Sequence, residues 1–89
     1  NNSSRSLWDH ILNFNSDNIL VVSMQPLENE HAIIVHVREI SGNITPIKIT
    51  SNYLPYLTIQ EVNALNQRIL DNPAHLKPYE SKFLKILLP

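Results

Sequence analysis

The chain has 89 residues, a formal net charge of −1 and no cysteine. This length allows a single domain with one modest hydrophobic core. The scattered Lys and Arg residues argue against a nucleic-acid partner, because phosphate recognition needs a basic face. The apolar runs are far shorter than the roughly 18 residues of a membrane span, which argues against a membrane partner. Without cysteine there is neither a disulfide nor thiolate chemistry.

The first residues, N-N-S-S, are polar and lack an initiator methionine. Residues 1–6 are therefore expected to be a linker or a cut end, and residues 7–89 a single domain. No basic and apolar leader resembles a signal peptide. Together with the absence of cysteine, this weakly favours a cytoplasmic location.

Residues 6–14 allow two interpretations. As a helix, Ser6 could act as the N-cap; as a strand, Trp8, Leu12 and Phe14 would share one face. The asparagines around Phe14 are poor in a helix interior, so extended structure is favoured. Residues 19–24 then predict a short strand, which stops or reaches a sheet edge at Pro26 because proline cannot donate to a ladder.

Residues 31–40 predict the central strand, reached through a polar reversal at 27–30. Ile33, Val35 and Val37 share an apolar face that should form the core. The other face begins apolar and should become more exposed toward Arg38.

The second half of the chain predicts further short strands separated by turns. Gly42-Asn43 should turn the chain, and residues 44–50 should return it as one strand with Ile47 and Ile49 inward. Residues 57–63 predict the next strand, and residues 64–70 either a helical turn or an extended piece. A corner at 78–80 leads into a terminal strand at 82–88. The count is six or seven short strands, which indicates an all-β, small antiparallel β-sandwich.

The sequence contains no group of residues with the spacing expected of a catalytic or metal-binding site. The four histidines, at positions 10, 31, 36 and 75, have no ligand-like spacing, since His31 and His36 would point to opposite faces of a strand. The acids Glu28, Glu30, Glu39 and Glu61 are expected to be solvated turn and edge residues. No catalytic, cofactor-binding or metal-binding residue is therefore predicted in this chain.

The aromatic residues carry the one weak binding prediction. Trp8, Tyr53 and Tyr56 could form a stacking platform for a sugar, because aromatic rings offer flat apolar faces with a polar tip. Trp8 is more often a core residue at such spacing, and Tyr79, beside a proline at a strand corner, is more often a packing residue.

Three patches of the sequence, taken together, resemble one family. They are I-V-H-V-R-E-I-S-G at 34–42, E-V-N-A-L-N-Q-R-I at 61–69 and L-K-P-Y-E-S-K-F-L-K-I at 76–86. In this order they are similar to the C-terminal β domain of glycoside hydrolase family 38, the α-mannosidases. The resemblance covers roughly residues 7–88. His36 and Arg38 depart from the residues usual in that family.

This resemblance implies a non-catalytic C-terminal accessory domain of a retaining α-mannosidase, inactive by itself. The parent's catalytic Asp and its divalent metal, usually zinc, would lie in an upstream catalytic domain, so neither carries over to a residue here. The implied partners are the remainder of the parent enzyme and, through it, a carbohydrate substrate. Two alternatives stay open, namely the same lobe from another glycosidase family and a sugar-binding or interaction module.

Overall fold

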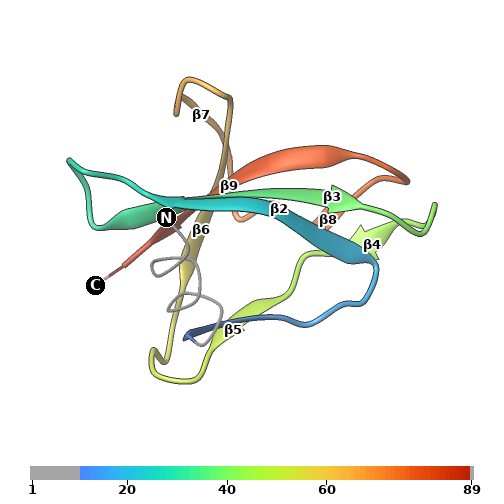
Figure 1. The fold of residues 1–89 in the computed structure, drawn as a ribbon, viewed down its shortest axis with the longest axis horizontal. Coiled ribbons are helices and arrows are strands. Elements are labelled where there is room, and N and C mark those ends of the chain that lie inside the picture. The colour runs from blue at the N-terminus through green and yellow to red at the C-terminus, as the bar shows by residue number, and fades with distance from the viewer. Residues whose placement is uncertain (1–10, 89) are drawn as a thin grey trace.

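The structure is a computed structural model that describes residues 11–88, and within them the chain forms β-strands joined by turns (Figure 1). The nine strands of this part are short, and two of them have only two residues. They are β1 (Leu12–Phe14), β2 (Ile19–Pro26), β3 (Ala32–Glu39), β4 (Thr45–Pro46), β5 (Ile49–Ser51), β6 (Thr58–Val62), β7 (Arg68–Asp71), β8 (His75–Leu76) and β9 (Ser81–Leu87).

Five of these strands form one antiparallel sheet in the order β2-β3-β9-β6-β7. The terminal strand β9 lies at its centre, pairing with β3 on one side and β6 on the other. This central place follows from its sequence, because Leu84 and Ile86 are completely buried on one face. The two sheet edges are β2, which carries a bulge between Val21 and Ser23, and β7.

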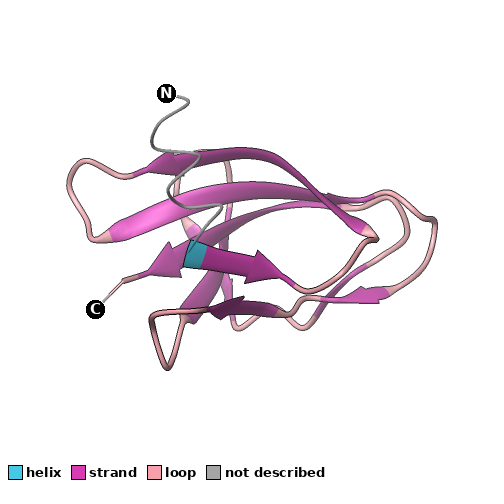
Figure 2. Cartoon of the chain, turned by 60° about the horizontal axis from the view of Figure 1, so that its bottom comes forward, coloured by secondary structure: helices cyan, strands magenta, loops and turns pink. Residues whose placement is uncertain are grey.

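The pairs β1–β5 and β4–β8 make a second layer against one face of the five-stranded sheet (Figures 1 and 2). The core lies between the layers, since buried residues of the sheet cluster with Leu12 of β1 and Leu76 of β8. Partly buried residues of the second layer, including Ile49, pack against the same cluster. The predicted all-β sandwich is therefore confirmed, with more strands than the six or seven expected.

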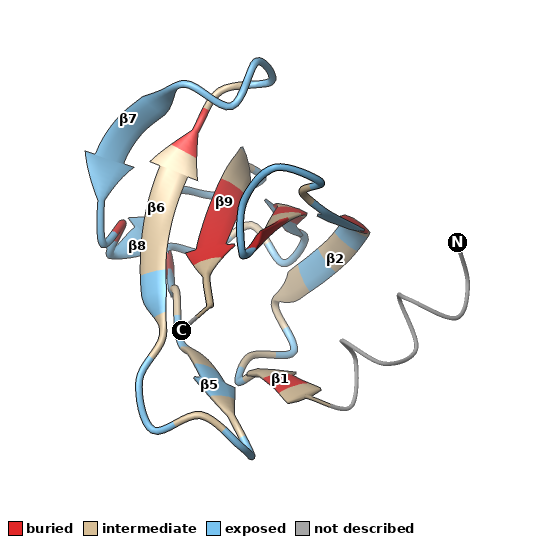
Figure 3. Ribbon diagram, turned by 90° about the vertical axis from the view of Figure 1, so that its left-hand side faces the viewer, coloured by how far each residue is buried: buried red, intermediate tan, exposed pale blue. Residues whose placement is uncertain are grey.

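The predicted faces of the central strand are also confirmed. Ile33, Val35 and Val37 are 0%, 0% and 1% exposed, respectively. On the opposite face Ala32 is buried and Arg38 is exposed, as the pattern indicated. Figure 3 shows how burial concentrates on the strands at the centre of the sheet and falls away toward β7.

The prediction of a single returning strand at 44–50 is wrong. The segment is split into β4 and β5, which pair with β8 and β1 rather than with β3. Pro46 ends the first piece because it has no N–H to continue a ladder, and Ile44 is 68% exposed. Ile47 and Ile49 still pack toward the core, as expected.

Smaller differences occur at the strand ends. Extended structure is confirmed for β1, although Ile11 just before it is helical, and residues 1–10 lie outside the described residues. β2 runs on through Pro26, which the sheet tolerates because β2 is an edge strand. Of the two possibilities for residues 64–70, the chain turns and then extends as β7. In the part that the structure describes, no helix has the length and apolar character needed to cross a bilayer.

Candidate functional site

The most highly organised polar group of the described residues is the Glu39 carboxylate, at the end of β3. Strand alternation places Glu39 on the same face as Ile33, Val35 and Val37, and its exposed fraction is 0%. The prediction that Glu39 is a solvated edge acid is therefore wrong. A charge in this position requires several hydrogen-bond donors, because an isolated buried carboxylate is very costly.

The donors come from the turn that follows β3. The backbone N–H of Ser41 donates to Oε2 of Glu39 at 2.9 Å. Those of Gly42 and Asn43 donate to Oε1 at 2.7 and 3.2 Å. The Ser41 hydroxyl also donates to Oε2. The turn is thus wrapped around the carboxylate, which explains why the chain does not leave β3 as a simple β-hairpin.

A further donor comes from the other end of the domain. The backbone N–H of Tyr79 donates to Oε1 of Glu39 at 3.0 Å, and the N–H of Glu39 itself donates to the carbonyl of Glu80 at 2.9 Å. Glu39 therefore joins the turn after β3 to the corner before β9. We call Glu39 with these donor groups the carboxylate nest.

The nest determines the charge of Glu39. Burial alone would raise the pKa of this carboxyl, but hydrogen bonds from the Ser41 hydroxyl and from the backbone N–H groups of Tyr79, Ser41 and Gly42 lower it to about 2. A group with this pKa is an anion at neutral pH and does not take up a proton there. The arrangement therefore suits a structural anion rather than a general acid or base.

Gly42 completes the nest through its small size. Its φ is +83°, and a Cβ added to it would lie 2.7 Å from the phenol oxygen of Tyr79. Tyr79 also has a positive φ of 59°. The tyrosine ring consequently lies directly over the glycine, as a packing residue, although 59% of Tyr79 remains exposed.

The second quoted patch builds another turn, between β6 and β7. Oδ1 of Asn63 accepts hydrogen bonds from the N–H groups of Leu65 and Gln67 at 2.9 and 3.0 Å. Asn66 takes a positive φ of 61° within this turn, which Asn tolerates better than most residues. The Asn63 side chain thus stabilises the turn by accepting two backbone hydrogen bonds.

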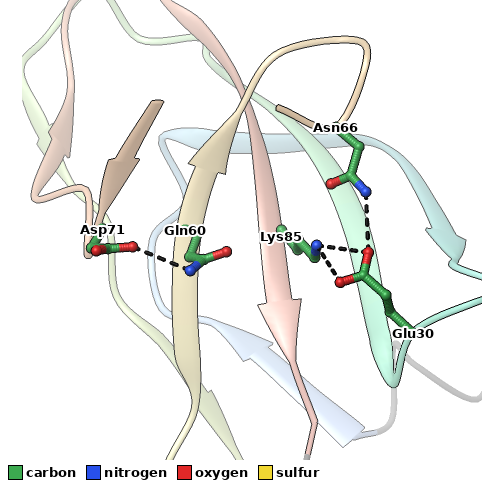
Figure 4. A network of polar contacts seen from close by, with 5 residues as sticks. All are labelled: Glu30, Gln60, Asn66, Asp71 and Lys85. Atoms are coloured by element: carbon green, nitrogen blue, oxygen red, sulfur yellow. Dashed lines mark hydrogen bonds and ion pairs between the residues drawn. The ribbon is translucent and has the colours of Figure 1, made fainter. Parts of the chain in front are cut away.

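Strand β9 and the β6–β7 turn are both linked to Glu30 of the β2–β3 hairpin, β9 by an ion pair and the turn by a hydrogen bond (Figure 4). Nζ of Lys85, on β9, lies 2.6 and 2.8 Å from the two carboxylate oxygens of Glu30. Asn66 donates to the same carboxylate at 3.2 Å. Lys85 is only 8% exposed, and its hydrogen bond lowers the pKa of Glu30. We call Glu30, Lys85 and Asn66 the clasp.

The other acids agree only in part with the prediction of solvated groups. Glu28 is exposed, as expected. Glu61 is partly buried and forms a 2.9 Å ion pair with Lys82. Glu30, Glu39 and Glu61 thus each have a partner in their own chain, which is not the arrangement of two carboxylates placed across a glycosidic bond.

In the described part of the chain, no ring contact joins Tyr53 to Tyr56, two of the residues predicted for sugar stacking. Tyr53 and Tyr56 are 73% and 86% exposed, and Trp8 lies outside the described residues. His36 stacks on Phe83 with ring centroids 4.5 Å apart. Within residues 11–88, no group of His, Asp and Glu side chains is arranged to hold a metal ion.

The sequence signal for the carboxylate nest was present but incomplete. Alternation along β3 puts Glu39 on the core face, and the following Ser-Gly is suited to a turn whose N–H groups point inward. The donor from Tyr79 could not be inferred, because it depends on a contact between distant parts of the chain.

These observations define an all-β domain in which the three quoted sequence patches supply the carboxylate nest, the β6–β7 turn and two members of the clasp. Residues 18–81 match the family described as "Glycosyl hydrolases family 38 C-terminal beta sandwich domain". The chain belongs to this family. Membership implies that the parent protein is a glycoside hydrolase of family 38 and that this chain is its accessory domain. No curated protein and no solved structure matches the chain significantly.

Proposed function

We propose that the chain is the C-terminal lobe of a retaining α-mannosidase, and that it packs on the catalytic body without taking part in the reaction. The match of residues 18–81 to the C-terminal sandwich family supports the assignment to such a parent, and the state of Glu39 supports a structural role for this lobe. Glu39 is the most highly organised acid of the described residues, and its carboxylate is fully occupied by hydrogen bonds from its own chain. An acid held in this way supports the fold and is unsuited to proton transfer.

Packing on a larger body is supported by the sheet edge at β7. Leu65, Ile69 and Leu70 are 78%, 58% and 52% exposed, respectively, and all four residues of β7 are exposed. An uncovered edge strand with apolar side chains favours unwanted association. Covering this edge with the parent enzyme would remove that hazard.

The proposal also includes a metal cofactor in the parent enzyme. A divalent metal, zinc in most enzymes of this kind, would bind in the catalytic domain and act on the sugar there. The accessory lobe then affects turnover only through the stability and position of the domain that it supports.

The test compares the natural polypeptide that carries this segment with the 89-residue chain. We expect the natural polypeptide to hydrolyse an aryl α-mannoside with retention of configuration, and the chain alone to show no turnover. Deleting the segment should lower the temperature at which activity is lost. Turnover by the isolated chain, or a natural polypeptide that cleaves only other glycosides, would contradict the proposal.

A second candidate function is sugar stacking on the loop before β6. It is favoured by the high exposure of Tyr53 and Tyr56 and by a hollow that Tyr56 lines together with Pro55 and Leu87. A tyrosine ring beside an apolar hollow is a suitable platform for the flat face of a pyranose.

A further inference from the structure

A hollow of about 240 Å³ lies on the outer face of the five-stranded sheet, away from the core. Its apolar part is formed by Ile34 of β3, Phe83 of β9 and Leu27 of the β2–β3 hairpin. Its polar part includes Ser23 and Gln25 of β2 and Asn66 of the β6–β7 turn. The hollow is therefore an open depression between the two hairpins that flank β9.

Several polar groups of the hollow have no partner within the described residues. The Ser23 hydroxyl and the Gln25 carboxamide make no side-chain hydrogen bond there. Asn66 uses its Nδ2 to donate to Glu30, and Figure 4 shows its oxygen turned away from that carboxylate. Together they offer two groups that can donate or accept and one free acceptor.

The clasp fixes one wall of this hollow. The ion pair between the nearly buried Lys85 and the exposed Glu30 orients the Glu30 carboxylate, which in turn holds the Asn66 amide. Since the carboxamide is held before a ligand arrives, less conformational entropy is lost on binding. Glu30 and Lys85 are not among the lining residues, and the lining contains no charged side chain.

We propose that this hollow is a binding site for a small, neutral, polyhydroxylated molecule of monosaccharide size. The polar groups match hydroxyls that both donate and accept, and the apolar floor matches the C–H face of a pyranose ring. A charged ligand would lose its hydration without gaining an ionic partner. The volume lies below the roughly 300–1,000 Å³ of sites for drug-sized ligands, so the ligand is small. This proposal is independent of the parent's catalytic activity.

The test is a titration of the ¹⁵N-labelled 89-residue chain, observed through its backbone and side-chain amide resonances. The probes are methyl α-D-mannopyranoside, methyl α-D-glucopyranoside and, as a charged analogue of similar size, sodium glucuronate. We expect saturable shifts at the Gln25 and Asn66 side-chain amides with the neutral probes, with a Kd on the order of 10 mM. Glucuronate should bind at least about fivefold more weakly.

Two variants and one control identify the site. Gln25→Ala should weaken binding of the neutral probe about fivefold, the effect of losing one hydrogen bond. Asn66→Gly should do the same while retaining the positive φ of the turn. Gln60→Ala removes the same type of side chain from the same face of the sheet, outside the hollow, and should leave the affinity unchanged.

Three results would overturn the proposal. One is the absence of saturable shifts at about 100 mM probe. Another is a set of shifts centred on Tyr53 and Tyr56, which would assign sugar binding to the tyrosine loop instead. The third is an equal loss of affinity in the Gln25→Ala and Gln60→Ala variants, which would show that the hollow is not the site.

Discussion

The backbone N–H of Tyr79 donates a 3.0 Å hydrogen bond to the Glu39 carboxylate, 40 residues earlier in the chain. The same carboxylate accepts from the turn that follows it. Two of the three sequence patches that indicate the family therefore meet at one buried anion. These two patches therefore contain the residues whose hydrogen bonds join the end of β3 to the beginning of β9.

Replacing this anion should destabilise the domain strongly. Glu39→Gln keeps the size of the side chain but leaves one acceptor oxygen and introduces an NH₂ donor facing backbone N–H groups. We expect the Tm to fall by roughly 10 °C or more. Glu28→Gln, at an exposed position, is the control and should leave the Tm nearly unchanged. Equal effects of the two substitutions in thermal unfolding followed by circular dichroism would contradict the role assigned to the nest.

Stability should also depend on pH in the acid range. The pKa of Glu39 in the folded protein, about 2, lies below its ordinary value of 4.5. The stabilisation from this group is therefore fully present above about pH 5 and is lost as the pH falls toward 2. The pKa values of Glu30 and Glu80 are lowered too, so they contribute in the same direction.

The measurement is the urea midpoint of unfolding at about pH 7, 5 and 3 for the natural chain and for Glu39→Gln. The difference between the two proteins should be largest at neutral pH and should shrink at about pH 3. A difference that stays constant over this range would show that Glu39 does not have a depressed pKa.

Gly42→Ala tests the contact between the turn and Tyr79. The substitution places a Cβ at a φ of +83° and 2.7 Å from the tyrosine oxygen. We expect a loss of about 1–3 kcal/mol, from backbone strain together with displacement of the ring. The Tyr79→Gly variant lacks the ring. Adding Gly42→Ala to that variant should therefore lower the free energy of unfolding by less than Gly42→Ala does in the natural chain. Additive costs in urea unfolding would exclude the packing contact.

Much of the sheet could be predicted from local pattern. Alternation along the chain located the central strand and its core face, and the apolar run near the C-terminus located β9. The split of residues 44–50 could not be predicted in this way. The split has two causes. The turn before this segment is hydrogen-bonded to Glu39, and β4 pairs with β8, whose residues lie about 30 positions later in the chain.

The polar sites show the same limit. The sequence gives no local reason to expect Glu30 on the β2–β3 hairpin beside Lys85, 55 residues later. Such a contact depends on the order of strands in the sheet, which the period of apolar residues does not specify. The turn at Asn63 has a local signal, because asparagine commonly accepts backbone N–H bonds in turns. The pattern of residues 64–70 alone, however, is compatible with either a helical turn or an extended piece.

Leu76 tests whether the short strand β8 is essential to the core. It is 0% exposed and belongs to the core cluster, although β8 has only two residues. Leu76→Ala should cost about 2–4 kcal/mol through lost burial and the remaining cavity. Leu65→Ala is the matched control, because Leu65 is 78% exposed, and should change stability by less than about 0.5 kcal/mol. Chemical denaturation of both variants gives the comparison.

The clasp predicts an asymmetry between its two charged partners. Lys85 is nearly buried, whereas Glu30 is exposed. Glu30→Gln leaves the ammonium of Lys85 buried without a counter-ion, and Lys85→Met replaces it with an apolar side chain of similar length. We therefore expect Glu30→Gln to lower the Tm more than Lys85→Met, and the double variant to be at least as stable as Glu30→Gln alone.

The same variants separate the clasp from a simple surface ion pair. A surface pair contributes little, and removal of either partner would then have a similar, small effect. The amide resonance of Asn66 provides a second measurement, because its Nδ2 donates to Glu30. It should move in both variants, because Glu30→Gln replaces the carboxylate to which Asn66 donates and Lys85→Met removes the ammonium that orients this carboxylate. An unchanged Asn66 resonance together with equal Tm values would show that the two hairpins are not coupled through Lys85.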